Sequence, residues 1–238
     1  MSLRRTLCHA GALLLASALA DCAGDVLDTL MPVSASATGT SKVTMLVATT
    51  RAADQDRGIL FSGERGAPSF AEITVSMPPD SARKVGEVQW PSRLPGSPET
   101  DFITLNVDRI DKAEALTRFH RMVQRTPKRR VLFFIHGFNN RFEDAVYRFA
   151  QIAHDSRAGA VPVLFTWLSR GSVFAYGDDR ESGNYSRSAL ENLFQSLARD
   201  PSVGEVSVLA HSMGNWVTLE ALRQMAIATA EFFRRSPM

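Results

Sequence analysis

The second half of the chain alternates continuous apolar runs with amphipathic segments. Three short stretches are apolar almost throughout: VLFFIHGF, VPVLFTWLS and EVSVLA. Segments with apolar residues at helical spacing precede, separate and follow them: residues 112–124, RFEDAVYRFAQIAHDS, SRSALENLFQSLARD and NWVTLEALRQMAIATAEFF. Strands that are apolar on both faces and alternate with helices predict an α/β fold, with a mainly parallel sheet covered by helices on both faces.

The first half of the chain predicts shorter strands instead. KVTMLVATTRA has alternating apolar residues at Val43, Met45 and Val47, which is the period of a strand. AEITVSMPP and GEVQWP read as further strands, each stopped by a proline, and DFITLNVDRI reads as a fourth. We therefore expect the sheet to start close to residue 42.

The N-terminus has the pattern of a signal peptide. Arg4 and Arg5 precede TLCHAGALLLASALA, which is apolar but far shorter than the roughly 20 residues of a spanning helix. Ala18-Leu19-Ala20 then fits a cleavage site. The expected organisation is a signal peptide at residues 1–20, a flexible tether at residues 21–41 and a folded domain at residues 42–238.

A second interpretation of the N-terminus concerns Cys22. The stretch LADC, Leu19 to Cys22, looks like a bacterial lipoprotein signal, although Asp21 stands where glycine or alanine is usual. Lipidation of Cys22 would associate the protein with a membrane. Both interpretations predict export, either to the bacterial periplasm or to the cell envelope by a lipid anchor; a frayed helix of a cytoplasmic protein is the remaining possibility.

Charge and cysteine content exclude several classes of protein. The 27 lysines and arginines nearly balance the 25 aspartates and glutamates, and no concentrated basic face points to a nucleic-acid partner. The only cysteines are Cys8 and Cys22, so the chain without its signal holds at most one thiol. Disulfide scaffolds and cysteine metal sites are therefore excluded, and we expect neither a metal nor an organic cofactor.

The candidate nucleophile is Ser212, within AHSMG at the junction of an apolar strand and a helix. A nucleophile elbow places a serine on such a strand-to-helix turn, usually in the pattern G-x-S-x-G. Ala210 replaces the first glycine, and Gly214 keeps the second. The alternative is that Ser212 only caps the helix, since serine favours that position. A cap does not explain the small residues on both sides.

A second turn, in FFIHGFNN, supplies the other half of the candidate site. A His-Gly turn after an earlier strand can offer backbone N–H groups to an oxyanion hole. We expect the hole to be formed by the N–H groups of Phe138 and Met213, with Gly137 in the turn. His136 is expected to orient the loop rather than to catalyse, and His211 to pack rather than to act as a base.

Together these motifs resemble the alpha/beta-hydrolase superfamily. Within it the chain is similar to a bacterial branch of exported, often lipoprotein-type, esterase-like proteins, most closely in RVLFFIHGFNNRFEDAVYRFAQ, PVLFTWLSRGSVFAYGDD and VLAHSMGNWVTLEAL. That branch has Trp-Pro-Ser-x-Gly and then Tyr-x-x-Asp. Here Trp167 begins the first motif, which lacks its proline, and the resemblance places Trp167, Tyr176 and Asp178 near the pocket. The alternative for Tyr176 and Asp178 is a surface loop.

The resemblance implies a serine hydrolase that acts on a small ester or amide through an acyl-serine intermediate. Its triad follows the order serine, acid, histidine, yet no histidine follows Ser212, and Glu220 and Glu231 lie within the last helix. His120 and His154 fall on helices that cover the sheet, so only a rearranged pair with His136 would remain. We therefore expect a C-terminally truncated domain that lacks the last strands and has little activity, with EVSVLA as an exposed edge.

Two other functions stay open. One is a non-catalytic, envelope-associated binding protein that keeps the pocket. The other is an acyltransferase, in which full-length relatives pass the acyl group from Ser212 to an acceptor other than water. Neither the substrate nor the oligomeric state follows from the sequence.

Overall fold

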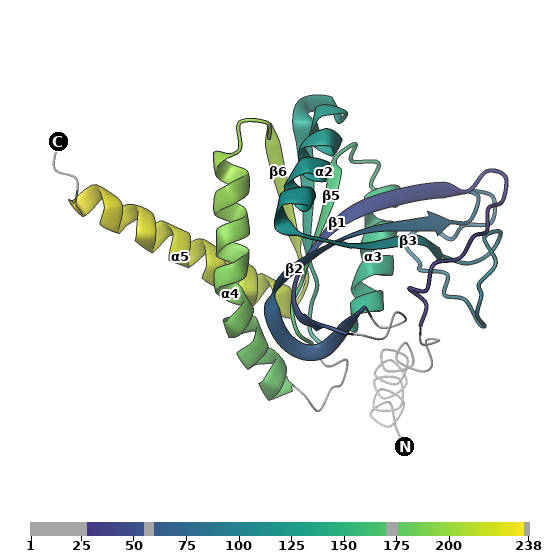
Figure 1. Ribbon diagram of the computed structural model, residues 1–238, viewed down its shortest axis with the longest axis horizontal. Coiled ribbons are helices and arrows are strands. Elements are labelled where there is room, and N and C mark those ends of the chain that lie inside the picture. The colour runs from purple at the N-terminus through teal and green to yellow at the C-terminus, as the bar shows by residue number, and fades with distance from the viewer. Residues whose placement is uncertain (1–27, 55–59, 170–175, 236–238) are drawn as a thin grey trace, which may run out of the picture.

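A computed structural model describes residues 28–54, 60–169 and 176–235. Six strands and four α-helices follow one another along this part of the chain (Figure 1). The elements are β1 (Ser41–Ala53), β2 (Phe61–Met77), β3 (Ile103–Ile110), α2 (Lys112–Gln124), β4 (Arg130–Ile135), α3 (Phe142–Asp155), β5 (Val161–Thr166), α4 (Tyr176–Arg199), β6 (Glu205–Ala210) and α5 (Met213–Arg235).

The six strands form one mixed sheet in the order β3-β2-β1-β5-β4-β6. The pairs β1–β5, β5–β4 and β4–β6 are parallel, whereas β2 is antiparallel to both β1 and β3. Parallel neighbours need a crossover connection, which the helices α3 and α4 supply. The α/β fold class with a mainly parallel sheet is thus confirmed, and the antiparallel part is confined to the N-terminal strands.

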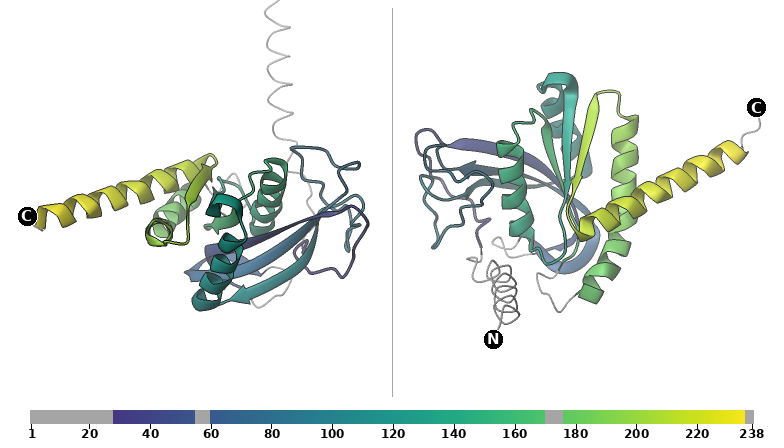
Figure 2. Two further views of the ribbon diagram at one scale, coloured as in Figure 1. Left: turned by 90° about the horizontal axis from the view of Figure 1, so that it is seen from above. Right: turned by 180° about the vertical axis from the view of Figure 1, so that it is seen from behind.

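Helices cover both faces of the sheet, as the apolar strands require. On one face, Phe142 and Phe149 of α3 pack with Phe134 of β4 and Ile73 of β2. The opposite face carries α2, α4 and α5, whose buried side chains surround Phe133 and Phe165. The C-terminal half of α5 extends beyond the rest of the molecule (Figures 1 and 2).

Two expectations about the N-terminal half are wrong. GEVQWP is not a strand: Gln89 instead binds loop carbonyls of Ala82 and Thr100, and Trp90 packs 4.9 Å from the Tyr147 ring. The expected tether is also anchored in part, because Leu30 is only 1% exposed and belongs to the core. The signal peptide and Cys22 lie outside the described residues.

Helix α4 begins ten residues before the segment that the sequence pattern marked. The early turns contain Gly177 and Gly183, which weaken a helical pattern. Their cost is offset by packing, because a Cβ on Gly183 would meet the side chain of Val217 at 3.0 Å. Ser186 also binds Thr50 of β1 at 2.7 Å. The contacts with α5 and β1, rather than local propensity, therefore extend α4.

Among the described residues β6 pairs with β4 alone and forms an edge of the sheet. Val208 and Leu209 are 44% and 41% exposed there. Large apolar side chains of α5 are exposed as well: Trp216, Leu219, Leu222 and Ile227. None of the described helices is both long enough and apolar enough to cross a membrane.

The two-sided core makes a prediction for stability. Phe133 is fully buried and contacts the Phe194 ring at 5.2 Å, so Phe133→Ala should lower the free energy of unfolding by about 3–5 kcal/mol. Leu219→Ala is the matched control, because this side chain is 64% exposed and its loss should stay within about 0.5 kcal/mol. Chemical denaturation of both variants measures the difference. Equal losses would contradict the packing.

Candidate active site

The candidate nucleophile stands where β6 passes into α5. Ser212 has φ 49°, in the left-handed region that a side chain makes costly. The carbonyl of His211 accepts from the Gly214 N–H at 2.8 Å, and that of Ser212 accepts from Asn215 at 3.0 Å, which closes a tight turn directly into the helix. Ser212 is exposed at the end of the strand. A strained, exposed serine on a strand-to-helix turn has the geometry of a nucleophile elbow.

Two glycines allow the β4 and β6 ends to meet. A Cβ on Gly214 would lie 2.4 Å from the His136 carbonyl oxygen and 2.8 Å from that of Ile135. A Cβ on Gly137 would lie 2.7 Å from the Nδ1 atom of His211 and 3.0 Å from the Cβ of Ser212. Any larger residue at either position would therefore separate the two turns.

A cavity of about 330 Å³ opens beside Ser212, and Phe138, Met213, Arg180 and Trp216 complete its lining. Met213 is the first residue of α5, and the first N–H groups of a helix have no partner within it. The two residues expected to form an oxyanion hole thus line the same cavity as the candidate nucleophile. Sequence analysis did not single out Arg180 or Trp216, because neither belongs to the AHSMG turn.

His136 is held in a fixed, neutral form. It is fully buried, and its ring stacks on Trp167 at 5.2 Å with an interplanar angle of 2°. The Trp167 backbone N–H donates to Nε2 at 3.2 Å, which leaves Nδ1 to donate to the Gly137 carbonyl at 2.8 Å. Burial, and then the charge of Arg51, lower its pKa to about 3. With both ring nitrogens occupied, His136 orients the loop and has no free nitrogen for Ser212.

The other described histidines lie elsewhere or are less enclosed. His120 pairs with Asp200 at 2.7 Å and His154 with Asp155 at 3.1 Å, both on covering helices. His211 is exposed, so the expectation that it packs is wrong.

A buried polar network lies beneath the two turns. Arg51 of β1 donates to the Asn140 carbonyl at 2.8 Å and to the Ser169 carbonyl at 3.1 Å. The Ser169 hydroxyl accepts from the Asn140 N–H at 3.1 Å and donates to the Asp179 carboxylate at 2.6 Å. Burial lowers the Arg51 pKa to about 10, with the nearby charges of Glu143, Asp179 and Asp144 acting against that shift. Arg51 therefore stays charged at neutral pH and ties the loop after β4 to the loop after β5.

The three residues that the resemblance places near the pocket have different surroundings. Trp167 is fully buried, and its indole N–H donates to the His136 carbonyl at 3.0 Å, so it supports the turn from beneath. Asp178 lies exposed in the first turn of α4, and it is the next residue, Asp179, that is fully buried. Tyr176 begins the same helix, and its side chain lies outside the described residues.

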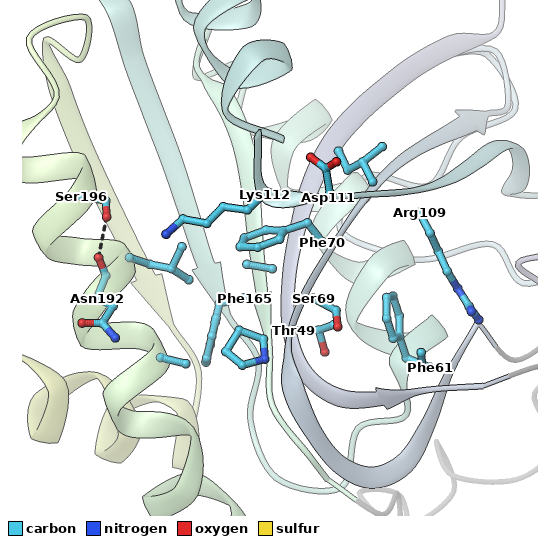
Figure 3. A pocket seen from close by; sticks show the side chains of 16 residues that line it. Thr49, Phe61, Ser69, Phe70, Arg109, Asp111, Lys112, Phe165, Asn192 and Ser196 are labelled. Carbon is cyan, nitrogen blue, oxygen red and sulfur yellow. Dashed lines mark hydrogen bonds between the residues drawn. The ribbon is translucent and has the colours of Figure 1, made fainter. Parts of the chain in front are cut away.

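A larger cavity of about 590 Å³ lies apart from Ser212, between the sheet, α4 and the start of α2 (Figure 3). Its lining is largely apolar, with Ala48, Phe70, Phe165 and Leu193 among its members. Lys112 reaches across it toward α4. None of the candidate site residues is among the described residues that line this larger cavity. In the part of the chain that the structure describes, no three His, Cys, Asp or Glu side chains are grouped to hold a metal ion.

The left-handed backbone at Ser212 leads to a prediction for the free energy of unfolding. Ser212→Gly should be more stable to unfolding than Ser212→Ala by about 1 kcal/mol, since glycine removes the Cβ strain. Denaturant unfolding of both variants measures this difference. At the exposed helical position Ser196 the order should reverse, because glycine weakens a helix relative to alanine. The same order at both positions would argue against a strained Ser212.

The buried imidazole of His136 leads to a prediction for the pH dependence of stability. The folded pKa of His136 is about 3 and the unfolded value is near 6.5, so between these values the unfolded chain binds the extra proton. Its contribution to stability is complete above pH 6.5 and falls by up to about 1.4 kcal/mol per pH unit as the pH drops toward 3. Ring nitrogen shifts of His136 in NMR should not change between pH 7.5 and pH 5. A midpoint near 6.5 would contradict the enclosure.

Comparison with known proteins gives a family but no activity. The family model described as alpha/beta hydrolase of unknown function (DUF900) matches residues 111–235. An uncharacterized protein of Nostoc sp. (strain PCC 7120) is 25% identical over 152 aligned residues, covering 53% of this chain and 39% of that relative. The chain thus spans well under half the length of this curated relative. No solved structure matches the present chain.

The family match begins at the N-cap of α2 and runs to the last residue of α5, so it contains both turns of the candidate site. With a mainly parallel sheet covered on both faces, the chain belongs to this alpha/beta hydrolase family of unknown function.

Proposed function

We propose that Ser212 is the nucleophile of a serine hydrolase that cleaves a small ester or amide through an acyl-serine intermediate. The observation that carries the proposal is the left-handed φ of 49° at an exposed serine that shares a cavity with Phe138 and Met213. Strain of this kind persists only where surrounding structure imposes it, and it concentrates at functional sites.

The reaction needs a base that the described site does not hold in position. When Ser212 attacks a carbonyl carbon, its hydroxyl proton must leave and the carbonyl oxygen becomes an anion. The N–H groups of Phe138 and Met213 would bind that anion. His136 is occupied on both nitrogens, and no histidine follows Ser212 in this sequence. We therefore propose that the described site turns over slowly unless a base reaches Ser212 from outside it.

The test is the labelling of Ser212 by a fluorophosphonate, followed by intact mass and peptide mapping, with and without imidazole in solution. Labelling of the folded chain should be slow and should rise by about tenfold with imidazole, which replaces a missing general base. Ser212→Ala and the denatured chain should show no such rise. His211→Gln is the control for a base supplied by the neighbouring residue.

The outcomes separate the possible functions. Fast labelling without imidazole would refute the slow turnover and keep the nucleophile. No labelling of Ser212 under either condition would overturn the hydrolase, leaving a binding protein that retains the cavity. An acyl-Ser212 adduct that a hydroxyl or amine acceptor removes faster than water does would indicate an acyltransferase. Export stays part of the proposal, either with cleavage after Ala20 or with a lipid anchor at Cys22, and the mass of the protein from its host distinguishes the two.

A further inference from the structure

The cavity beside Ser212 is lined by a cationic side chain. Among the described residues that line it, Arg180 is the charged one. The guanidinium lies over the Trp216 ring, 6.0 Å from the ring centroid. Arg180 belongs to the second turn of α4 and Trp216 to the first turn of α5, so two helices that pack together bring this pair to the nucleophile. We propose that Arg180, supported by Trp216, binds an anionic group of the substrate, so that the protein prefers acyl compounds carrying a carboxylate or a similar anion. This inference rests on Ser212 being the nucleophile.

The stacking arrangement suits Arg180 to this task. A guanidinium that lies over an aromatic face keeps the N–H groups along its edge available for hydrogen bonds. Those groups form a fork that matches the two oxygens of a carboxylate. Trp216 is 43% exposed, so the pair stands at the mouth of the cavity, where a substrate can reach it.

The neighbouring carboxylates do not neutralise this cation within the cavity. The Asp179 carboxylate points to Ser169 at 2.6 Å and is fully buried. Glu220 of α5 pairs with Arg223 at 3.1 Å and with Arg187 at 3.9 Å. No carboxylate lines the cavity among the residues that the structure describes. A bound anion would therefore meet the charge of Arg180, which forms no ion pair with the residues that the structure describes.

The size of the preference follows from the exposure of Arg180. A hydrogen bond to a charged group contributes more than a neutral one, but solvent weakens an exposed ion pair. We expect a preference of about tenfold for an anionic over a neutral compound of the same shape. Arg180→Gln should abolish the preference, and Arg180→Lys, which keeps the charge without the fork, should retain part of it.

The experiment compares two fluorophosphonates of equal length, one ending in a carboxylate and the other in a neutral carboxamide. The ratio of their Ser212 labelling rates, measured on the full chain with imidazole present, reports the preference. Arg199→Gln is the matched control, since it removes the same charge from an exposed position at the other end of α4. A ratio near one in the unmodified chain, or an unchanged ratio in Arg180→Gln, would overturn the proposal.

A second readout does not depend on reactivity. Glutarate, and its neutral diamide as the reference, are titrated while tryptophan fluorescence is recorded, and Trp216→Phe identifies the signal of this residue. Glutarate should change the Trp216 signal in the unmodified chain and in Arg199→Gln, but not in Arg180→Gln. If neither probe labels Ser212, the hydrolase proposal fails while this titration still decides the anion site. Equal responses to glutarate and the diamide would reject that site.

Discussion

The candidate site depends on the direct contact between the ends of β4 and β6. Gly137 and Gly214 permit that contact, since a Cβ on either would meet atoms of the opposite turn at less than 3 Å. The parallel register brings both strands to the same edge, with Ile135 opposite Ala210. The same contact positions Phe138 beside Ser212 and encloses His136. The candidate nucleophile, the candidate oxyanion donors and the buried His136 therefore share one steric requirement.

The buried groups around this contact have a supporting role. Arg51 ties together the loops that follow β4 and β5, and Asp179 orients the Ser169 hydroxyl that receives the Asn140 N–H. These groups do not line the cavity of Ser212. Loops of irregular backbone at the candidate site need such fixed partners, because their own peptide groups have few regular hydrogen bonds.

Local sequence was sufficient for the strands and turns that carry the motifs. AHSMG lies between an apolar strand and an amphipathic helix, so its position at the end of a strand followed from periodicity. Because the strands are apolar throughout, the sequence also predicted that helices cover both faces of the sheet. Arg51 could not be found in this way, since it lies 118 positions from Ser169 and contacts it only through the folded sheet. Asp178 and Asp179 differ by 100° around a helix, so choosing the buried one required knowing where α4 begins. Leu30 entered the core because Tyr147 and Thr104 bind the carbonyl of the preceding Thr29, a long-range contact that a small polar segment does not reveal.

The strand that leads into the Ser212 turn, β6, is also the strand of the parallel part with the fewest neighbours among the described residues. β4 and β5 have hydrogen-bonded neighbours on both sides, whereas among the described residues β6 has β4 alone. Amide hydrogens of β6 should therefore exchange with solvent through small local openings, well before those of β5 do. The strain stored at Ser212 lowers the cost of such openings further. A partner that covered this edge would bury apolar surface and would also restrict the motion of Ser212. Order at Ser212 and association at the sheet edge are therefore linked equilibria.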